Sequence, residues 1–275
     1  MALHKIFFNK YKNLNESPPK YRSDNPILVV DNVVKKFGGL VALDHVSISV
    51  AKGKVTMLIG PNGSGKSTLL NVISGFLRPD KGRIIYNGIE ITGMPPHRIN
   101  IMGIARTFQT PKPFMNLTVL ENMLVSARNN PGESFTGALR KSRWIKYEHK
   151  AVEKAEHILK ALRLDHLWDE KSSNLSGGQL KLLEIGRALM NDANLILMDE
   201  PIAGVNPSLA HDIFNIIREL TKKQGITFLI VEHRLDIALK YVDHVYAMSR
   251  GRIIAEGLPE NVVKSPAVIE SYLAG

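Results

Sequence analysis

The sequence predicts an α/β fold with a mostly parallel β-sheet at its core, an antiparallel β subdomain and an inserted α-helical subdomain. Three observations lead to this prediction. In the second half, short apolar runs that suit buried strands alternate with helical stretches, as in repeated β-α-β units. The first strand-like stretches alternate apolar and polar residues, which is typical of strands with one solvated face. A long middle segment has the apolar period of helices.

Length and composition are those of a folded protein with a sizeable core. Of the 275 residues, 44% are hydrophobic and 23% are charged, which excludes wholesale disorder. No apolar run approaches the roughly 18 residues that a membrane-spanning helix needs, so we expect no span. The absence of cysteine excludes disulfides, thiol nucleophiles and thiolate metal sites. Together with the lack of a secretory signal, it favours the cytoplasm.

The charge balance suits a polyanionic partner. The chain carries 36 basic and 26 acidic residues, a formal net charge of +10. A nucleotide, nucleic acid or an anionic membrane surface would each fit, and charge alone does not choose among them. The most basic segment, residues 135–157, comes with no array of stacking aromatic residues and no recognition module. We therefore expect a solvated helical face or a protein contact there, and no nucleic-acid partner.

The first part of the chain divides into an extension and a β-rich region. Residues 1–25 are polar, basic and without period, and we expect a flexible extension before one domain over residues 26–275. A dense apolar run, Val55–Ile59, predicts a strand covered on both faces, and the next segment predicts a loop and a helix reaching about Phe76. The strands expected in this part are 27–30, 33–37, 46–50, 55–59 and 81–86.

The remaining chain reads as a helical insertion followed by the rest of the α/β core. Residues from about 110 to 175 carry apolar residues at helical spacing with charged residues between them, which predicts the helical subdomain. A helix should follow, and further helices should separate the later strands. The strands expected in this part are 195–198, 227–231, 245–248 and 253–255, and one of the expected helices covers 209–220.

The strongest local motif follows the apolar run that ends at Ile59. It fits G-x-x-x-x-G-K-[ST], the phosphate-binding loop (P-loop), and it stands between a predicted strand and a predicted helix, which is the context this motif requires. Successive backbone N–H groups and the helix N-terminus favour anionic phosphates, Lys66 reaches the β and γ phosphates, and the Ser67 hydroxyl suits Mg²⁺. The residues expected to hold ATP here are Gly60, Pro61, Asn62, Gly63, Ser64, Gly65, Lys66, Ser67 and Thr68.

Two adjacent acids end a later apolar strand. Asp199 and Glu200 follow Leu195–Met198, and the carboxyl ends of strands are where ligands bind in α/β sheets. An enzyme with a P-loop needs a carboxylate there to hold Mg²⁺, which fits Asp199. Because strand side chains alternate in direction, Glu200 points differently and suits a general base for the attacking water.

Two further fragments are Leu175-Ser176-Gly177-Gly178-Gln179 and Arg106-Thr107-Phe108-Gln109. They resemble the signature and the Q-loop of the ATP-binding cassette (ABC) ATPase family, and the resemblance covers the chain from about Ile27 to Ala274. His233, after the strand that ends at Val231, resembles its switch histidine. Phe37 resembles the aromatic residue that stacks on adenine. The order and spacing of these fragments match the family.

The resemblance implies a division of roles. Glu200, His233 and Gln109 would be catalytic, and Gln109 would join Ser67 and Asp199 around Mg²⁺. The signature would bind ATP held by the opposite subunit, because a helix start with backbone N–H groups and a hydroxyl is a second anion site. The residues implied for that second site are Ser176, Gly177, Gly178 and Gln179.

Within the family, the chain resembles the larger ATPase of branched-chain amino acid importers. One departure is Asn206, which stands where most members carry an acid that couples the two sites of a dimer. The fragments behind the closer similarity are 103–109, 116–122, 183–189, 203–207, 231–233 and 254–257, with Tyr272-Leu273 at the end.

The resemblance also implies partners and leaves alternatives. An importer ATPase works at the cytoplasmic face of the cell membrane with a second ATPase subunit and two integral membrane permease subunits, and indirectly with a substrate-binding protein. One alternative is a soluble ABC-type ATPase acting on nucleic acid or ribosomes, although the chain has neither a long heptad insertion nor a second P-loop. A lipopolysaccharide-export ATPase is another alternative, since that class shares several fragments.

Overall fold

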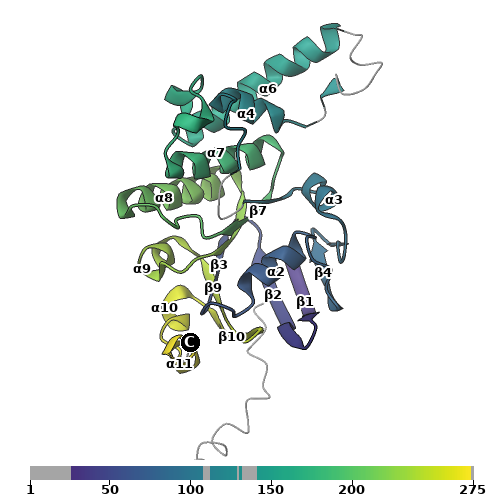
Figure 1. The fold of residues 1–275 in the computed structure, drawn as a ribbon, viewed down its shortest axis with the longest axis vertical. Coiled ribbons are helices and arrows are strands. Elements are labelled where there is room, and N and C mark those ends of the chain that lie inside the picture. Colours follow the sequence, from purple (N-terminus) through teal and green to yellow (C-terminus); the bar gives the residue numbers. More distant parts are fainter. Residues whose placement is uncertain (1–25, 108–111, 129, 132–140, 274–275) are drawn as a thin grey trace, which may run out of the picture.

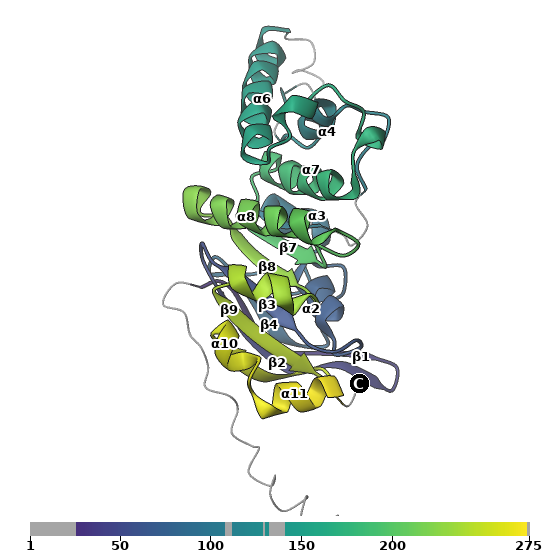
Figure 2. The same ribbon diagram turned by 90° about the vertical axis from the view of Figure 1, so that its left-hand side faces the viewer.

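The molecule is elongated, with helices packed together at one end and two β-sheets towards the other (Figures 1 and 2). The computed structural model describes residues 26–107, 112–128, 130–131 and 141–273. The predicted extension, residues 1–25, and the predicted site residue Gln109 lie outside the described residues.

A six-stranded sheet forms the centre of the molecule. In sheet order its strands are β10 (Arg252–Gly257), β9 (His244–Ser249), β3 (Val55–Ile59), β8 (Thr227–Val231), β7 (Leu195–Asp199) and β6 (Ile104–Arg106). All neighbouring pairs are parallel except β10 with β9. Every residue of β3 and β8 is buried. Because β3, β8 and β7 are parallel neighbours, the loops that follow them meet at one edge of the sheet.

The central sheet is the wall between two hydrophobic cores. Side chains alternate in direction along a strand, so Met57 faces one core and Leu58 the other. The core that contains Met57 also holds the helices at the upper end of Figure 1. The core that contains Leu58 holds the second sheet and the helix after the P-loop. This two-sided burial explains why the central strands are continuous apolar runs.

The second sheet is antiparallel and has the order β2-β1-β4-β5. Its strands are β1 (Pro26–Phe37), β2 (Leu40–Ala51), β4 (Lys81–Tyr86) and β5 (Ile89–Glu90). The sequence predicted two strands within β1, whereas the structure has one. Asn32 has a φ of 51°, and the pairing with β2 shifts between Val30 and Val33. A β-bulge therefore interrupts the apolar pattern without ending the strand.

Helices α4, α6 and α7 pack against one another and form the end of the molecule away from the second sheet (Figure 2). The α-helices are α2 (Lys66–Ile73), α3 (Pro96–Ile101), α4 (Val119–Val125), α6 (Lys141–Ala161), α7 (Gly177–Met190), α8 (Pro207–Gln224), α9 (Leu235–Ala238), α10 (Pro259–Val262) and α11 (Pro266–Leu273). Short 3₁₀ turns cover 165–167, 172–174 and 239–241. No helix among the described residues is long and apolar enough to cross a membrane.

The predicted α/β fold, with its mostly parallel sheet and its antiparallel sheet, is confirmed. The sequence did not predict β6 or the last two helices, α10 and α11. Helix α2 ends at Ile73, earlier than the predicted Phe76. The limits assigned to the extension, the domain and the helical subdomain stay predictions.

Candidate functional site

The P-loop runs from the end of β3 to the start of α2, as its sequence predicted. Gly60, Gly63 and Gly65 all have positive φ angles, and Gly65 is the N-cap of α2 in the left-handed region. These angles curl the backbone in a way that residues with a Cβ adopt only with strain. The loop therefore presents its N–H groups and the N-terminus of α2 on one side, which is the arrangement that binds phosphates.

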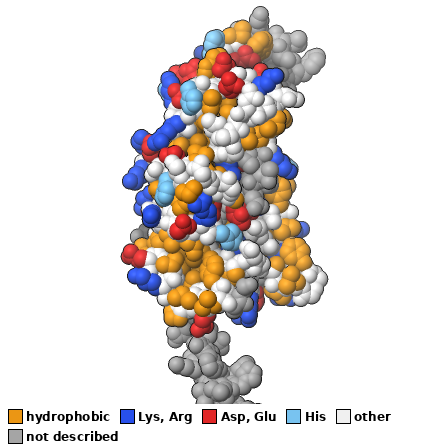
Figure 3. Space-filling model, turned by 60° about the vertical axis from the view of Figure 1, so that its left-hand side comes forward, with side chains coloured by type: hydrophobic (Ala, Val, Ile, Leu, Met, Phe, Trp, Pro, Cys, Tyr) orange, Lys and Arg blue, Asp and Glu red, His pale blue; other side chains and the backbone are white. Residues whose placement is uncertain are grey.

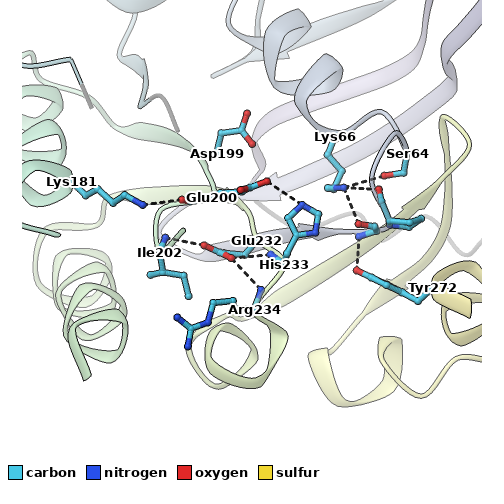
Figure 4. A network of polar contacts seen from close by, with 12 residues as sticks. Ser64, Lys66, Lys181, Asp199, Glu200, Ile202, Glu232, His233, Arg234 and Tyr272 are labelled. Atoms are coloured by element: carbon cyan, nitrogen blue, oxygen red, sulfur yellow. Dashed lines mark hydrogen bonds and ion pairs between the residues drawn. The ribbon is translucent and has the colours of Figure 1, made fainter. Parts of the chain in front are cut away.

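Lys66 lies within this curl, where its side chain is held by the loop itself. Its Nζ donates to the backbone carbonyls of Gly60 and Pro61, both at 2.8 Å, and to Ser64 Oγ at 3.3 Å (Figure 4). Burial lowers the pKa of Lys66, and the carboxylates of Glu200 and Asp199 partly offset that effect. A desolvated cation is a strong partner for an anion that enters the site.

A cavity of about 530 Å³ opens beside the loop. Its described lining brings together residues far apart in the sequence, including Phe37 from β1, Glu200 after β7 and His233 after β8. Phe37 is 45% exposed, so it is not a core residue. The P-loop residues that line the cavity are Asn62, Gly63, Gly65, Lys66, Ser67 and Thr68. The structure thus gathers six predicted P-loop residues with Phe37, Glu200 and His233 at one cavity. The predicted residues Gly60, Pro61, Ser64 and Asp199 are described but are not part of its lining.

Glu200 and His233 contact each other across the edge of the sheet. The distance from Glu200 Oε1 to His233 Nε2 is 3.2 Å, and both side chains are about 30% exposed, at 27% and 32%. Glu200 follows β7 with a φ of 52°, an unusual angle for a residue with a Cβ. Because β7 ends at Asp199, this turn sets the direction of Glu200, and not the alternation along a strand that the sequence predicted.

A buried acid, Glu232, positions both loops. Its carboxylate accepts N–H bonds from Ile202 at 2.9 Å, His233 at 2.8 Å and Arg234 at 3.2 Å. The first of these residues follows β7 and the other two follow β8. Glu232 is 2% exposed, so these charge-assisted bonds are shielded from water. The spacing between the Glu200 loop and the His233 loop therefore depends on Glu232.

Asp199 is the last residue of β7, and its carboxylate lies near Arg106 of β6. The distance from Arg106 Nη2 to Asp199 Oδ2 is 3.5 Å. The same guanidinium donates to Asn71 Oδ1 at 2.6 Å and to Ser74 Oγ at 3.1 Å, which ties β6 to α2. Arg106 stands three residues before Gln109, so it links the start of the predicted Q-loop to Asp199.

Hydroxyl and carboxylate oxygens, as on Ser67 and Asp199, are the donors that Mg²⁺ prefers. Mg²⁺ commonly takes only one or two protein ligands and fills its octahedron with phosphate and water oxygens. Among the described residues, no three His, Cys, Asp or Glu side chains gather closely enough to hold a metal ion. Ser67 and Asp199 would supply two oxygen ligands, and phosphates and water would complete the coordination.

The signature residues lie at the start of α7, apart from the cavity. Ser176 is the N-cap, with its Oγ accepting from Gln179 N at 3.4 Å and Gln179 Oε1 accepting from Ser176 N at 2.8 Å. Ser176 and Gly177 are exposed. Gly178 is buried, and a Cβ on it would lie 2.2 Å from Leu209 of α8. Gly178 of the signature thus allows α7 to pack against α8, whereas Ser176 and Gly177 face outward.

Asn206, the departure noted in the sequence, is the N-cap of α8. Its Oδ1 accepts from Leu209 N at 2.9 Å. Asparagine and aspartate cap helices about equally well, so the helix start does not require an acid. The substitution removes a charge while it keeps the cap.

Comparison with known proteins identifies the family. The ABC transporter family profile matches residues 43–203, which include both the P-loop and the acidic pair. The chain belongs to the ABC transporter family. The family resemblance and the ATPase class predicted from the sequence are confirmed.

Relatives and solved structures agree with this membership. The chain is 56% identical over 256 residues to a probable branched-chain amino acid transport ATP-binding protein LivG of Methanocaldococcus jannaschii, covering 92% of this chain and 99% of that protein. A crystal structure of the ADP conformation of an ATP-binding cassette has a TM-score of 0.79 at 54% identity and covers 91% of this chain and 99% of that one. A dimeric cassette bound to ADP and Pi has a TM-score of 0.68 at 25% identity, covering 84% and 98%.

Sequence reasoning assigned no role to three residues that act on this site through others. They are Arg106 beside Asp199, Glu232 between the loops, and Tyr272, whose hydroxyl accepts from the Gly60 N–H at 2.8 Å. Arg106 and Glu232 each stand within a fragment that carries the family resemblance, so an unexplained charge inside a motif was the available signal. No local pattern connects Tyr272 to Gly60.

Proposed function

We propose that this chain is the ATPase subunit of an importer for branched-chain amino acids. The observation that carries the proposal is the convergence of Lys66, Glu200 and His233 on one cavity in an ABC transporter family member. The substrate is inferred from the name of the relative from M. jannaschii. At 56% identity over nearly the whole chain, a shared transport substrate is the simplest inference.

ATP occupies the cavity with its phosphates on the P-loop and its adenine against Phe37. The half-exposed ring at the mouth of the cavity offers a face for stacking. Lys66 Nζ exchanges its backbone carbonyl acceptors for β- and γ-phosphate oxygens. That exchange is favourable because a charged acceptor binds a desolvated ammonium more strongly than a neutral carbonyl does.

Mg²⁺ would be held with ATP by Ser67 and Asp199 and, in this proposal, by Gln109. The ion would supply positive charge that stabilises the phosphates during hydrolysis. Arg106 contributes by fixing the Asp199 carboxylate from the side of β6. A fixed carboxylate costs less reorganisation when the ion and nucleotide arrive.

Glu200 accepts the proton of the attacking water, and His233 orients the Glu200 carboxylate. Hydrolysis of the γ-phosphate needs a base within hydrogen-bond reach of the water, and Glu200 faces the cavity beside Lys66. The 3.2 Å contact with His233 holds the carboxylate in that direction. Glu232 keeps the two loops at a constant separation.

Two ATPase subunits are needed for a complete site. The signature is exposed at the start of α7, whereas the phosphate loop lies at the cavity, so the two anion sites of one chain face different surroundings. We infer that a second subunit, identical or a sibling ATPase, places its signature over the ATP held here. The dimeric cassette among the solved structures supports this inference.

The helical end of the molecule contacts the membrane subunits in this proposal. Large apolar side chains are exposed there, one of which, Phe114, also stacks against the Arg187 guanidinium, 5.3 Å from the ring centroid. They are Phe114, Met115, Val125 and Trp168. An exposed apolar surface of this kind is typical of a protein contact site. We propose that it receives cytoplasmic segments of two permease subunits, which places the chain at the cytoplasmic face of the membrane.

Transport in liposomes tests the substrate. The chain is reconstituted with its membrane subunits, a partner ATPase and the substrate-binding protein, and ATP hydrolysis and leucine uptake are followed together. We expect leucine-bound binding protein to stimulate hydrolysis and ATP to drive uptake. If hydrolysis is not stimulated by branched-chain amino acids but is stimulated by another solute, the proposed substrate is wrong. Stimulation by nucleic acid would contradict the transport role.

Cross-linking tests the membrane contact. The sequence contains no cysteine, so Asn116→Cys places a single thiol on the exposed segment before α4. We expect capture of a permease subunit in the assembled complex. Glu260→Cys, at an exposed residue of α10 at the opposite end, is the matched control and should capture none. The reverse result would place the contact at the other end of the molecule.

A further inference from the structure

The last helix of the chain contacts the first residue of the P-loop. Tyr272 is on α11, and its hydroxyl oxygen accepts the Gly60 N–H at 2.8 Å (Figure 4). The two residues are 212 positions apart in the sequence. Burial raises the pKa of the Tyr272 hydroxyl, so the group is neutral at physiological pH and its oxygen is a fixed acceptor.

The Gly60 N–H lies just beyond the hydrogen-bond ladder of the central sheet. Pairing of β3 with β9 ends at Ile59 and Ala247, and pairing of β3 with β8 ends at Leu58. Gly60 itself is buried. A buried N–H without an acceptor is strongly unfavourable, so this position needs a partner that no strand supplies. Tyr272 is that partner.

Gly60 also connects to Lys66, which makes its position important for the site. Its carbonyl accepts from Lys66 Nζ at 2.8 Å while its N–H donates to Tyr272. Its φ is +149°, and a Cβ on it would lie 2.0 Å from Met248 O on β9. The residue is therefore fixed by β9 on one side, by Tyr272 on another and by Lys66 on the phosphate side.

Helix α11 lies on the surface and holds this contact from outside the sheet. Ile269 is 48% exposed and Leu273 is 83% exposed, whereas Val268 is buried. Figure 3 shows hydrophobic side chains gathered on the lower part of this face, where α10 and α11 lie. A short surface helix thus reaches the phosphate site with one hydroxyl.

We propose that Tyr272 is a positioning residue for the P-loop, which couples the C-terminal helix to nucleotide affinity. Its hydroxyl fixes the Gly60 peptide and so maintains the loop conformation in which Lys66 and the loop N–H groups bind phosphates. Without the hydroxyl, the loop occupies other conformations that satisfy the Gly60 N–H. Apparent affinity falls in proportion to the lost fraction of the competent form. This inference rests on the proposed binding of ATP at the P-loop.

The test replaces the acceptor and keeps the ring. For Tyr272→Phe we expect the Kd for ATP, measured with a fluorescent ATP analogue, to rise about 5- to 30-fold, the effect of one lost hydrogen bond to a buried group. Leu273→Ala, on the same helix and largely exposed, is the control and should leave the Kd unchanged. In the assembled transporter, KM for ATP should rise while kcat stays near that of the parent protein. A purely structural defect would lower both kcat and the amount of active protein.

Amide exchange in ¹⁵N-glycine-labelled protein gives a second, direct readout. In the folded Tyr272→Phe variant, the Gly60 amide should exchange at least tenfold faster than in the parent, while glycines remote from the loop, such as Gly186, keep their rates. Unchanged Kd and unchanged Gly60 exchange would overturn the proposal. Failure of the parent protein to bind ATP would instead contradict the proposed function, so the two failures are distinguishable.

Discussion

Two helix starts in this chain use similar chemistry in different surroundings. At the start of α2, Lys66 is 6% exposed and is held by carbonyls of its own loop. At the start of α7, Ser176 and Gly177 are exposed, and the Ser176 hydroxyl caps its own helix. Both starts are anion sites in principle. The difference indicates that the first is prepared for its ligand within one chain, and that the second gains its ligand only when another subunit supplies it.

The largest expected effect comes from a substitution that blocks ATP hydrolysis and leaves both helix starts intact. Glu200→Gln keeps the size of the side chain but cannot accept a proton from water. We expect the hydrolysis rate to fall by about 10²- to 10⁴-fold, with ATP still bound and two chains held together around it. The rate is measured in the assembled transporter, and dimers are measured by size-exclusion chromatography with ATP. Glu219→Gln, a solvent-exposed acid on α8, is the control.

Near-native hydrolysis by Glu200→Gln would remove Glu200 from the base role. Loss of ATP binding in the same variant would mean that the carboxylate acts in binding, because its charge also faces Lys66.

Removing Lys66 tests the first helix start directly. Lys66→Ala deletes the buried cation that faces the phosphates, and we expect the Kd for ATP to rise about 100-fold, by the loss of charge-assisted hydrogen bonds. Equilibrium titration of the isolated subunit gives the Kd. Lys54→Ala, an exposed lysine just before β3, should bind as the parent does. Equal affinity in Lys66→Ala and the parent would contradict the assignment of the phosphate site.

A charge at the second helix start separates binding from assembly. A Cβ on Gly177 meets no heavy atom within 4 Å in the described part of the chain, so Gly177→Asp fits sterically. An acid in the first turn also suits the helix dipole, so the subunit stays folded. The added negative charge repels the triphosphate of the opposite subunit. We expect ATP affinity of the single subunit to stay unchanged while hydrolysis and ATP-dependent dimerisation fall at least tenfold.

Gly177→Ala is the matched control for that experiment, since it adds the Cβ without the charge. It should retain most of the dimerisation and hydrolysis. If Gly177→Asp dimerises and hydrolyses ATP as well as Gly177→Ala does, the signature does not face a phosphate across the interface.

The same comparison explains what the sequence could predict. The P-loop is one contiguous stretch of sequence, and the acidic pair is another. Within each stretch, the spacing of residues along the chain already determines which groups meet. The capping of α7 was predictable for the same reason, because Ser176 and Gln179 are three residues apart. The α/β core followed from apolar runs buried on both faces of the sheet.

Contacts between distant segments were not predictable in this way. Tyr272 contacts Gly60 only because β9 pairs with β3 and the chain after β10 brings α11 to the end of β3. Glu232 reaches from the loop after β8 to Ile202 in the loop after β7 because those strands are neighbours in the sheet, an order that the sequence does not state. Strand β6 is only three residues long, too short for a periodic signal, although it carries Arg106 to Asp199.

The smallest expected effect is a pH dependence of ATP affinity, which would distinguish the buried anion site at Lys66 from the exposed one at Ser176. Burial lowers the pKa of Lys66 from the ordinary value of 10.5. The triphosphate favours the charged amine, so the pKa in the complex is higher than in the free subunit, and binding takes up a proton wherever the free amine has lost one. Affinity is therefore fully present below the pKa of the free subunit and falls as pH rises through it, at most tenfold per pH unit. We expect the fall to begin below pH 10.5, as measured by ATP titrations across pH.

Lys66→Arg stays charged in this range, so its weaker affinity should show no such step. A parent profile as flat as that of Lys66→Arg would contradict a lowered pKa at the first helix start.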